Sequence, residues 1–247
     1  MHRRLAARRL LTASRHRGLA SAAVCTKIGG LLEFQEGMSQ EALAKGQVRI
    51  KVAAAGVNFA DVLKCRGLYQ EKADPPFVPG NELAGEVCEV GEGVSHLALG
   101  DQVVCLSRGG AFASESVADA RTCLKLPPTS RDISEAAGLL VNFGTAHLAL
   151  ASRANLQAGQ SVLVTAAAGG VGLAAVELAK LMGASQVVPA CGSDEKLALA
   201  ASKGALAAGV NYSGMDGKAF RSALKGVVSQ RMILDARPRA DCCSSCC

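Results

Sequence analysis

Long apolar runs are missing from this sequence, and so are closely spaced cysteines over most of its length. No apolar run approaches the ~20 residues that a membrane-spanning helix needs, so we expect no membrane span. No two cysteines before the last six residues have the C-x-x-C spacing of zinc ribbons and redox motifs. The scattered single cysteines are instead typical of small buried hydrophobic residues.

Acidic residues are absent from the start of the chain, where Glu33 is the first. Residues 1–26 are rich in Arg, Leu, Ala and Ser, which is typical of a mitochondrial transit peptide. We expect cleavage between Gly18 and Lys27 and a location in the mitochondrial matrix; a disordered basic tail is the alternative. The six arginines of this segment equal the formal net charge of +6, so the rest of the chain is neutral and does not indicate nucleic-acid binding.

The most informative segment is 161–184, SVLVTAAAGGVGLAAVELAKLMGA. An apolar run, small residues and then apolar positions at helical spacing predict a buried strand, a tight turn and an amphipathic helix. Such a turn brings backbone N–H groups and a helix N-terminus to the pyrophosphate of a dinucleotide. A tightly packed turn that binds nothing is the alternative, but the apolar run 186–190 and the helix after it favour a cofactor site. The predicted cofactor-binding residues of the turn are Ala168, Gly169, Gly170, Val171 and Gly172.

The first half of the chain reads as many short strands separated by glycine turns, a pattern typical of a partly open β-barrel. A short helical turn is expected at 58–63, and a loop rich in glycine and proline at 66–79. A largely buried helix over 134–150, capped by Asp132 or Ser134, is expected to bridge two domains. The expected strands lie at 48–52, 83–90, 101–105, 111–117 and 123–126.

Several segments in this order resemble the medium-chain dehydrogenase/reductase superfamily, and within it the zinc-free quinone oxidoreductases related to ζ-crystallin. They are GVNFADVL, GLYQ, FVPGNELAGEV, VGEGV, GDQVV, GTAHLAL and AAAGGVGLAAVELAKLMGA. The resemblance runs from about Lys27 to Asp235. It implies an α/β fold with a GroES-like, partly open β-barrel domain over 27–150 and an incomplete Rossmann domain, a doubly wound parallel sheet, over 151–235.

The zinc enzymes of this superfamily resemble the chain less well. They use a cysteine where Asn58 stands and a histidine where Asn81 stands, and an asparagine amide is a poor zinc ligand. The four-cysteine structural lobe of those enzymes is also missing. The resemblance therefore implies chemistry without a metal.

We expect NADPH rather than NADH as the cofactor. NAD-preferring sites commonly place an acidic residue at the end of the second strand, whereas this strand ends in the small residues Ala190 to Ser193. Lys196 follows and supplies a cation for a 2′-phosphate. By the family resemblance, Tyr212 lines the adenosine end and Thr145 contacts the cofactor. A solvated surface lysine and a helix-packing threonine are the alternatives.

The resemblance implies hydride transfer from NADPH to a quinone or another α,β-unsaturated carbonyl. Asn58 corresponds to a polar residue of the family near the nicotinamide and substrate, and Tyr69 is placed to line the substrate mouth. Roles as a loop cap for Asn58 and a loop-packing residue for Tyr69 are the alternatives. The resemblance also implies a homodimer for a full-length form.

The end of the chain departs from the family. A helix over 216–228 and a strand over 232–235 are expected, but the cysteine-rich segment 236–247 resembles nothing in the superfamily. An alternative hypothesis is therefore a truncated product without full activity, which at most binds a cofactor or a partner. Binding of a soft metal by the terminal cysteines and binding of RNA, known for some ζ-crystallin relatives, are further possibilities with little support in the sequence.

Overall fold

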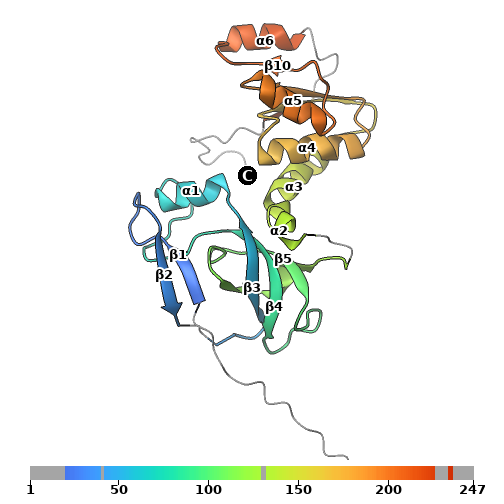
Figure 1. Ribbon diagram of the computed structural model, residues 1–247. Helices are drawn as coiled ribbons and strands as arrows, with labels where there is room; N and C mark the ends of the chain where they lie inside the picture. Colours follow the sequence, from blue (N-terminus) through green and yellow to red (C-terminus); the bar gives the residue numbers. More distant parts are fainter. Residues whose placement is uncertain (1–19, 40–41, 129–131, 226–232, 236–247) are drawn as a thin grey trace, which may run out of the picture.

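The computed structural model describes residues 20–39, 42–128, 132–225 and 233–235. Two β-sheets dominate it, one in the first half of the chain and one in the second, with helices α2 and α3 between them (Figure 1). The first sheet is antiparallel and the second parallel. This arrangement confirms the predicted α/β class with a barrel-like domain and a Rossmann-type domain.

The first sheet has five strands in the order β6-β3-β4-β5-β7. Its centre is β3 (Gln47–Gly56) paired with β4 (Glu82–Val90), because alternate residues of both strands point into one apolar core. The outer strands are β5 (Gln102–Leu106), β6 (Glu115–Asp119) and β7 (Cys123–Lys125). The sheet leaves β6 and β7 as edges, so the barrel is open as predicted.

One predicted strand begins later in the chain than expected. We predicted a strand over 111–117, but Ala111 and Phe112 donate their N–H groups to the carbonyls of Gly80 and Pro79. These bonds hold the segment outside the ladder, and β6 begins only at Glu115.

A hairpin at the start of the described chain was not predicted. It pairs β1 (Ala20–Val24) with β2 (Glu33–Met38). Ala22 and Val24 are each 2% exposed, and the N–H of Ala23 bonds to the carbonyl of Phe112. Alanine is a weak strand former, so local residue preferences do not predict β1. The strand falls within the segment assigned above to a transit peptide.

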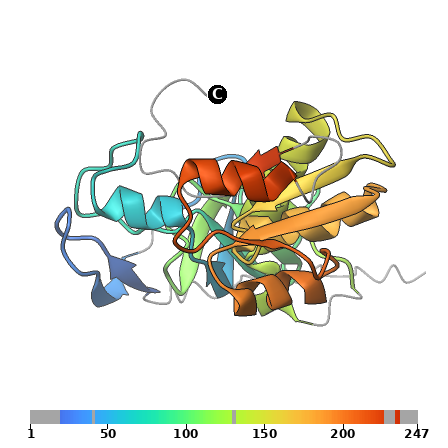
Figure 2. The same cartoon turned by 90° about the horizontal axis from the view of Figure 1, so that it is seen from above.

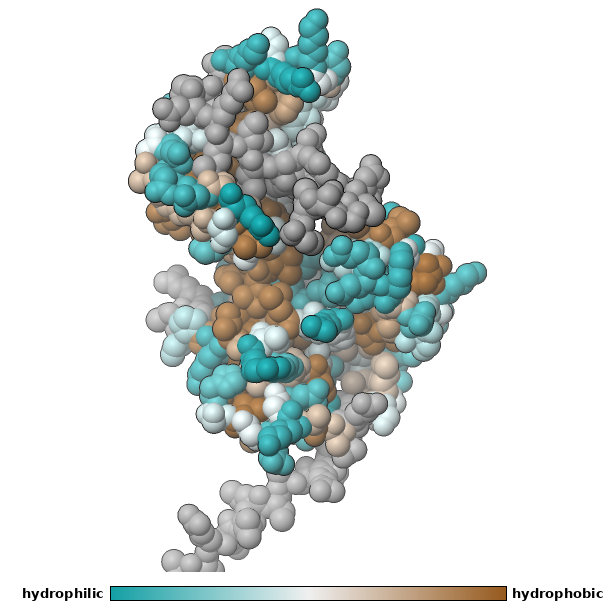
Figure 3. All heavy atoms as spheres, turned by 180° about the vertical axis from the view of Figure 1, so that it is seen from behind, coloured by the Kyte–Doolittle hydropathy of each residue, from teal (hydrophilic) through white to brown (hydrophobic). Residues whose placement is uncertain are grey.

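The bridging helix is broken, which corrects the prediction of one largely buried helix. Asp132 caps α2 (Ile133–Ala136) by accepting the N–H of Ser134. Gly138 then leaves helical geometry at φ −98° and ψ 9°, and α3 (Leu139–His147) follows and continues into a π-helical turn, η2 (Leu148–Arg153). The bridging segment is therefore not largely buried, since Leu148 in η2 is 52% exposed. Figure 3 shows apolar side chains on the surface at mid-height of the molecule.

The second sheet has the strand order β10-β9-β8-β11, all parallel. The element bounds are β8 (Ser161–Thr165), α4 (Gly170–Leu181), β9 (Gln186–Cys191), α5 (Asp194–Ser202), β10 (Val210–Asn211), α6 (Gly217–Lys225) and β11 (Ile233–Asp235). The strand order reverses beside β8, because β9 and β10 lie on one side of it and β11 on the other. Open α/β sheets bind ligands at such a switch point.

Both faces of this sheet are covered. Val162 and Val164 face a core shared with α4 and α5, whereas Leu163 faces a second core shared with Phe220 and Leu224 of α6 (Figure 2). The alternation explains why all five residues of β8 are buried. The predicted third helix and fourth strand are thus present, although Val227, Val228 and Met232 lie outside the described residues.

Pro189 lies inside β9 rather than marking the end of the strand. Val187, two residues earlier and on the same side of β9, accepts the N–H of Leu206 on the side of β10. Pro189 faces that same side, where pairing with β10 begins only at Ala190. Its missing N–H therefore interrupts no ladder bond, which is the condition under which a sheet tolerates proline.

None of the helices that the structure describes is both long enough and apolar enough to cross a membrane.

Candidate functional site

The glycine turn after β8 is built so that backbone, not side chain, faces outward. Ala166 adopts a positive φ of 48°, and its carbonyl accepts the N–H of Gly169, the N-cap of α4. A Cβ on Gly172 would overlap the Ala166 carbonyl oxygen and lie 2.8 Å from Ala167 Cα. Glycine at this position is therefore required for the helix to pack against the turn.

The turn is open to solvent where a phosphate would bind. Gly169 and Gly170 are exposed, Ala168 and Val171 are half-buried, and Gly172 is buried. They lead into a 12-residue helix whose first N–H groups have no partners within the helix. The combination of free N–H groups and the positive end of a helix dipole fits an anionic diphosphate.

Helix α3 packs against this turn through Asn142, a residue that the sequence analysis did not single out. A Cβ on Gly170 would lie 2.6 Å from Asn142 Oδ1. The Asn142 amide also donates to the carbonyl of Gly138 at 2.9 Å, which holds the side chain against the break before α3. Thr145 is exposed three residues later, on the same face of α3 as Asn142. The structure thus places Thr145 on the helix face nearest the glycine turn.

The predicted adenosine-end residues come together at the carboxyl end of β9. Ser193 caps α5 by accepting the N–H of Lys196, and a Cβ on Gly192 would lie 3.6 Å from Tyr212 Cε2. The Tyr212 ring is also held edge-on by Phe220, with ring centroids 5.9 Å apart. Lys196 is exposed, and its charge acts on the buried Cys191 thiol at the end of β9 by lowering that pKa, although burial raises it more.

Two acidic side chains follow Ser193 and behave differently. The Asp194 carboxylate accepts the amide N–H of Asn211 at 2.8 Å. The Ser193 hydroxyl donates to Glu195, which lowers the pKa of that exposed carboxyl group. Glu195 therefore stays ionised beside Ser193 and opposes the binding of a second anion there.

A small cavity lies beside the Tyr212 ring, at the carboxyl end of β8. It measures about 150 Å³ and is lined by Thr165, Tyr212, Met215, Asp216, Gly217 and Phe220. Its position between β8 and α6 matches the switch point of the sheet.

In the barrel domain, Asn58 is fixed by a buried carboxylate. Asn58 precedes α1 (Phe59–Cys65), and its amide Nδ2 donates to Glu82 Oε1 at 2.9 Å. The other oxygen, Glu82 Oε2, accepts the N–H of Val141 in α3, also at 2.9 Å. Glu82 is only 1% exposed, so both bonds lie away from water. Its two acceptors join the barrel to the bridging helix.

Asp61 holds the backbone of Asn58 in place by a hydrogen bond. Asp61 Oδ2 accepts the backbone N–H of Asn58 at 2.9 Å, while Oδ1, buried with the rest of the side chain, has no hydrogen-bond partner. Burial raises the pKa of Asp61 above its ordinary value, and the N–H group of Asn58 offsets part of that rise. Asn58 is thereby held at both its backbone and its side chain.

This chain resembles known proteins in both sequence and structure, and these resemblances agree with the features described above. The family profile described as alcohol dehydrogenase GroES-like domain matches residues 44–128. The quinone oxidoreductase-like protein 2 homolog of Nematostella vectensis is 46% identical over 188 residues, 75% of this chain and 51% of that protein. A probable oxidoreductase from Mycobacterium abscessus is 34% identical with a TM-score of 0.74, covering 85% of this chain and 67% of that one.

The chain belongs to the quinone oxidoreductase branch of the medium-chain dehydrogenase/reductase superfamily.

A further member of this branch, the Escherichia coli quinone oxidoreductase solved in complex with NADPH, is 30% identical with a TM-score of 0.76. It is matched over 83% of this chain and 63% of its own length. The chain spans about half the length of the quinone oxidoreductase-like protein 2 relatives, such as the 54% matched in Rattus norvegicus.

The structure does not bring every predicted site residue of this quinone oxidoreductase-like chain together. Tyr69 is half-buried in the loop after α1, where its N–H bonds to the carbonyl of Leu63 in the last turn. Asn58 stands at the opposite end of the same seven-residue helix, which is about 10 Å long. Tyr69 therefore lies at the far end of α1 from the Asn58–Glu82 bond.

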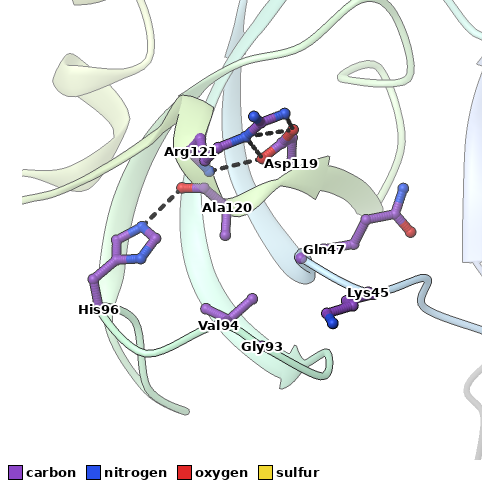
Figure 4. A pocket seen from close by; sticks show the side chains of 9 residues that line it. Lys45, Gln47, Gly93, Val94, His96, Asp119, Ala120 and Arg121 are labelled. Carbon is purple, nitrogen blue, oxygen red and sulfur yellow. Dashed lines mark hydrogen bonds and ion pairs between the residues drawn. The ribbon is translucent and has the colours of Figure 1, made fainter.

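A second pocket of about 360 Å³ lies at the other end of the barrel (Figure 4). The pocket opens beside Gln47, the first residue of β3, whereas Asn58 follows Gly56, the last residue of that strand. The ten residues of β3 separate its two ends by about 30 Å. His96 bonds to the carbonyl of Ala120, and Arg121 pairs with Asp119. The His96 contact joins the loop after β4 to the turn after β6.

The Glu82 bridge yields a direct test. Replacing Glu82 with Gln leaves one oxygen for two donors and turns an N–H₂ group toward the other, so a buried donor loses its acceptor. We expect Glu82→Gln to lower the free energy of unfolding by about 1–3 kcal/mol, measured by urea denaturation. Glu86→Gln, exposed in the same strand, is the matched control and should change it by less than about 0.5 kcal/mol. Equal effects of the two variants would contradict the bridge.

Proposed function

We propose that this oxidoreductase-family chain binds NADPH across the glycine turn and transfers hydride to a quinone or another α,β-unsaturated carbonyl, without zinc. The observation that carries the proposal is a continuous set of contacts from Asn58 to the turn. Asn58 bonds to Glu82, Glu82 bonds to Val141 of α3, and Asn142 of the same helix packs on Gly170. A residue suited to the acceptor is thus tied to the residues suited to the diphosphate.

The Asn58 amide has the right donor capacity for such an acceptor. Its nitrogen carries two hydrogens, and one is used by Glu82. The second is left to donate to the carbonyl oxygen of a quinone or enone, where negative charge develops as hydride arrives. The nicotinamide cofactor, when bound, supplies that hydride; water supplies the proton that completes reduction of the oxygen. Asn58 orients and polarises the acceptor and does not itself transfer a proton.

Zinc independence is supported by the donor set at this place. Asn58 and Asn81 offer neutral amides, and the carboxylate beside them is already occupied by two N–H donors. Thiolate, imidazole and carboxylate groups with free lone pairs are the usual zinc ligands. Turnover that survives dialysis against a chelator is expected.

The choice of NADPH depends on Ser193, Lys196 and Tyr212 together. Asp194 is engaged by Asn211 instead of standing free for a ribose hydroxyl, and Lys196 supplies a mobile cation next to Ser193. Glu195 acts against this preference, because its charge lies beside Ser193. We propose that the Lys196 cation, and a strand end without a free acidic side chain, outweigh the repulsion from Glu195. The Ser193 hydroxyl would then turn from Glu195 to the 2′-phosphate.

The cofactor preference can be measured through Lys196. Loss of one charge-assisted contact of ~1.5 kcal/mol corresponds to a roughly tenfold weaker Kd. We expect Lys196→Ala to raise the Kd of NADPH about tenfold, measured by quenching of nicotinamide fluorescence, and to leave that of NADH unchanged. Lys203→Ala, at the C-cap of the same helix and paired with Glu177, is the control and should alter neither. Equal losses for NADPH and NADH after Lys196→Ala would refute a 2′-phosphate contact.

Turnover tests Asn58. In assays of NADPH oxidation with a soluble quinone, Asn58→Ala should lower kcat by about 10²-fold, the typical cost of removing one donor aimed at a developing oxyanion, while the Kd of NADPH stays within twofold. Asn155→Gly, at an exposed turn residue whose positive φ of 48° suits glycine, should leave kcat unchanged. Cofactor binding by the wild type with no turnover of any quinone or enone would support the binding-only alternative.

We also propose that the basic start of the chain directs the protein to mitochondria. The arginines and hydroxyl residues that support this lie in residues 1–19, outside the part that the structure describes. Fusion of residues 1–26 to a fluorescent protein should give mitochondrial fluorescence, and replacement of the six arginines by glutamine should abolish it. Cytosolic fluorescence from the unchanged fusion would end this proposal.

A further inference from the structure

Two cysteines stand directly opposite each other at the edge of the barrel. In the pairing of β5 with β7, Cys105 is the partner of Cys123. Three residues away on both segments, the N–H of Leu126 bonds to the carbonyl of Gln102, so Gln102 and Leu126 form a hydrogen-bonded pair. Because the two kinds of pair alternate along an antiparallel ladder, Val104 with Leu124 is again hydrogen-bonded and Cys105 with Cys123 is not.

This kind of pair suits a covalent bond between the side chains. Residues in a non-hydrogen-bonded pair have Cα atoms about 4.5 Å apart and side chains closer together than in the other kind. Disulfides span Cα separations of roughly 4.4–6.8 Å. The backbone N–H of Cys123 agrees with the assignment, since it bonds to Ala120 of its own turn and not to β5.

The surroundings favour one thiol as the nucleophile. A hydrogen bond from Cys123 lowers the pKa of Cys105, and the Thr122 hydroxyl, 3.5 Å from Cys105 Sγ, acts in the same direction against the opposing effect of burial. The same contact with Cys105, together with burial, raises the pKa of Cys123. Both thiols are buried, whereas Thr122, which contacts Cys105 and precedes Cys123 in the chain, is exposed, so the pair lies close to the surface.

We propose that Cys105 and Cys123 form an oxidative modification site, where a hydroperoxide converts the two thiols into a disulfide across β5 and β7. The Cys105 thiolate attacks the peroxide and becomes a sulfenic acid, releasing water or an alcohol. The Cys123 sulfur then attacks the sulfenic sulfur and expels water. Two thiols are oxidised by two electrons, one peroxide bond is reduced, and both thiol protons leave in the products.

The bond would act where the sheet is weakest. Among the described residues, β7 has three residues and pairs with β5 alone, so it is an edge held by few ladder bonds. It is also the last strand before the chain leaves for α2. On the side of β5 away from β7, Cys105 pairs with Leu83 of β4, the residue next to Glu82. A disulfide would therefore fix the edge strand one ladder step from the carboxylate that holds Asn58.

Peptide mapping of the oxidised full chain tests the proposal. The protein is incubated with excess hydrogen peroxide, denatured in N-ethylmaleimide, digested with trypsin without reduction and analysed by mass spectrometry. A Cys88→Ser background is used because Cys88 shares the tryptic peptide 73–108 with Cys105. We expect peptide 73–108 linked to peptide 122–125, with the loss of two hydrogens and of both labels, and reversal by dithiothreitol.

The comparisons make the outcome decisive. Cys105→Ser in the same background should leave Cys123 fully labelled, and Cys123→Ser should leave Cys105 as a sulfenic acid trapped by dimedone. The exposed Cys88 of the unsubstituted chain, oxidised in parallel, shows that the peroxide was active. Full labelling of both Cys105 and Cys123 under conditions that oxidise Cys88 would overturn the proposal, as would linkage of either residue to Cys25, Cys65 or the terminal cysteines instead. The mapping of the Cys88→Ser chain stands without the serine variants if these fail to fold.

Discussion

A buried carboxylate in β4 is the constraint on which the site depends. A carboxyl group away from water is tolerated only when donors satisfy its oxygens. Glu82 finds one donor in the Asn58 side chain and another in the Val141 backbone, residues from two elements on either side of it. The same demand shapes the backbone nearby, because a Cβ on Gly56 would overlap the Glu82 carboxylate and lie 2.8 Å from the Ala137 carbonyl oxygen. Satisfying Glu82 thus orients the Asn58 side chain and joins the barrel to α3.

The glycine turn supplies the second half of the arrangement by close approach. Gly170 makes room for Asn142, and Gly172 makes room for the turn itself. Neither position accepts a Cβ without moving a neighbour, so these glycines serve packing. Because α3 carries both the N–H that Glu82 binds and the amide that rests on Gly170, it links the position of Asn58 to the glycine turn. That continuity supports the proposed cofactor site over a glycine-rich connection that binds nothing.

The sequence predicted the features that depend on local pattern. The strand, turn and helix over 161–184, the helical turn at 58–63 and the open barrel all follow from spacing within short windows, and the structure confirms them. Contacts between distant residues were not predictable in the same way: Glu82 and Val141 are 59 positions apart. Glu82 is one of three glutamates in β4, so nothing in the sequence set it apart, and Asn142 carried no signal either. Alanine-rich β1, two-residue β10 and the break at Gly138 were missed because tertiary contacts, not propensity, decide them.

A crystal structure of the chain bound to NADPH would show whether Asn58 and the glycine turn are two ends of one cofactor and acceptor site, coupled through Glu82 and α3. We predict the diphosphate on the N–H groups at Gly170 and Val171, the 2′-phosphate beside Ser193 and Lys196, and the nicotinamide ring facing the Asn58 amide with the Glu82 bond intact. A nicotinamide ring turned away from Asn58, or a diphosphate bound anywhere other than the turn, would contradict it.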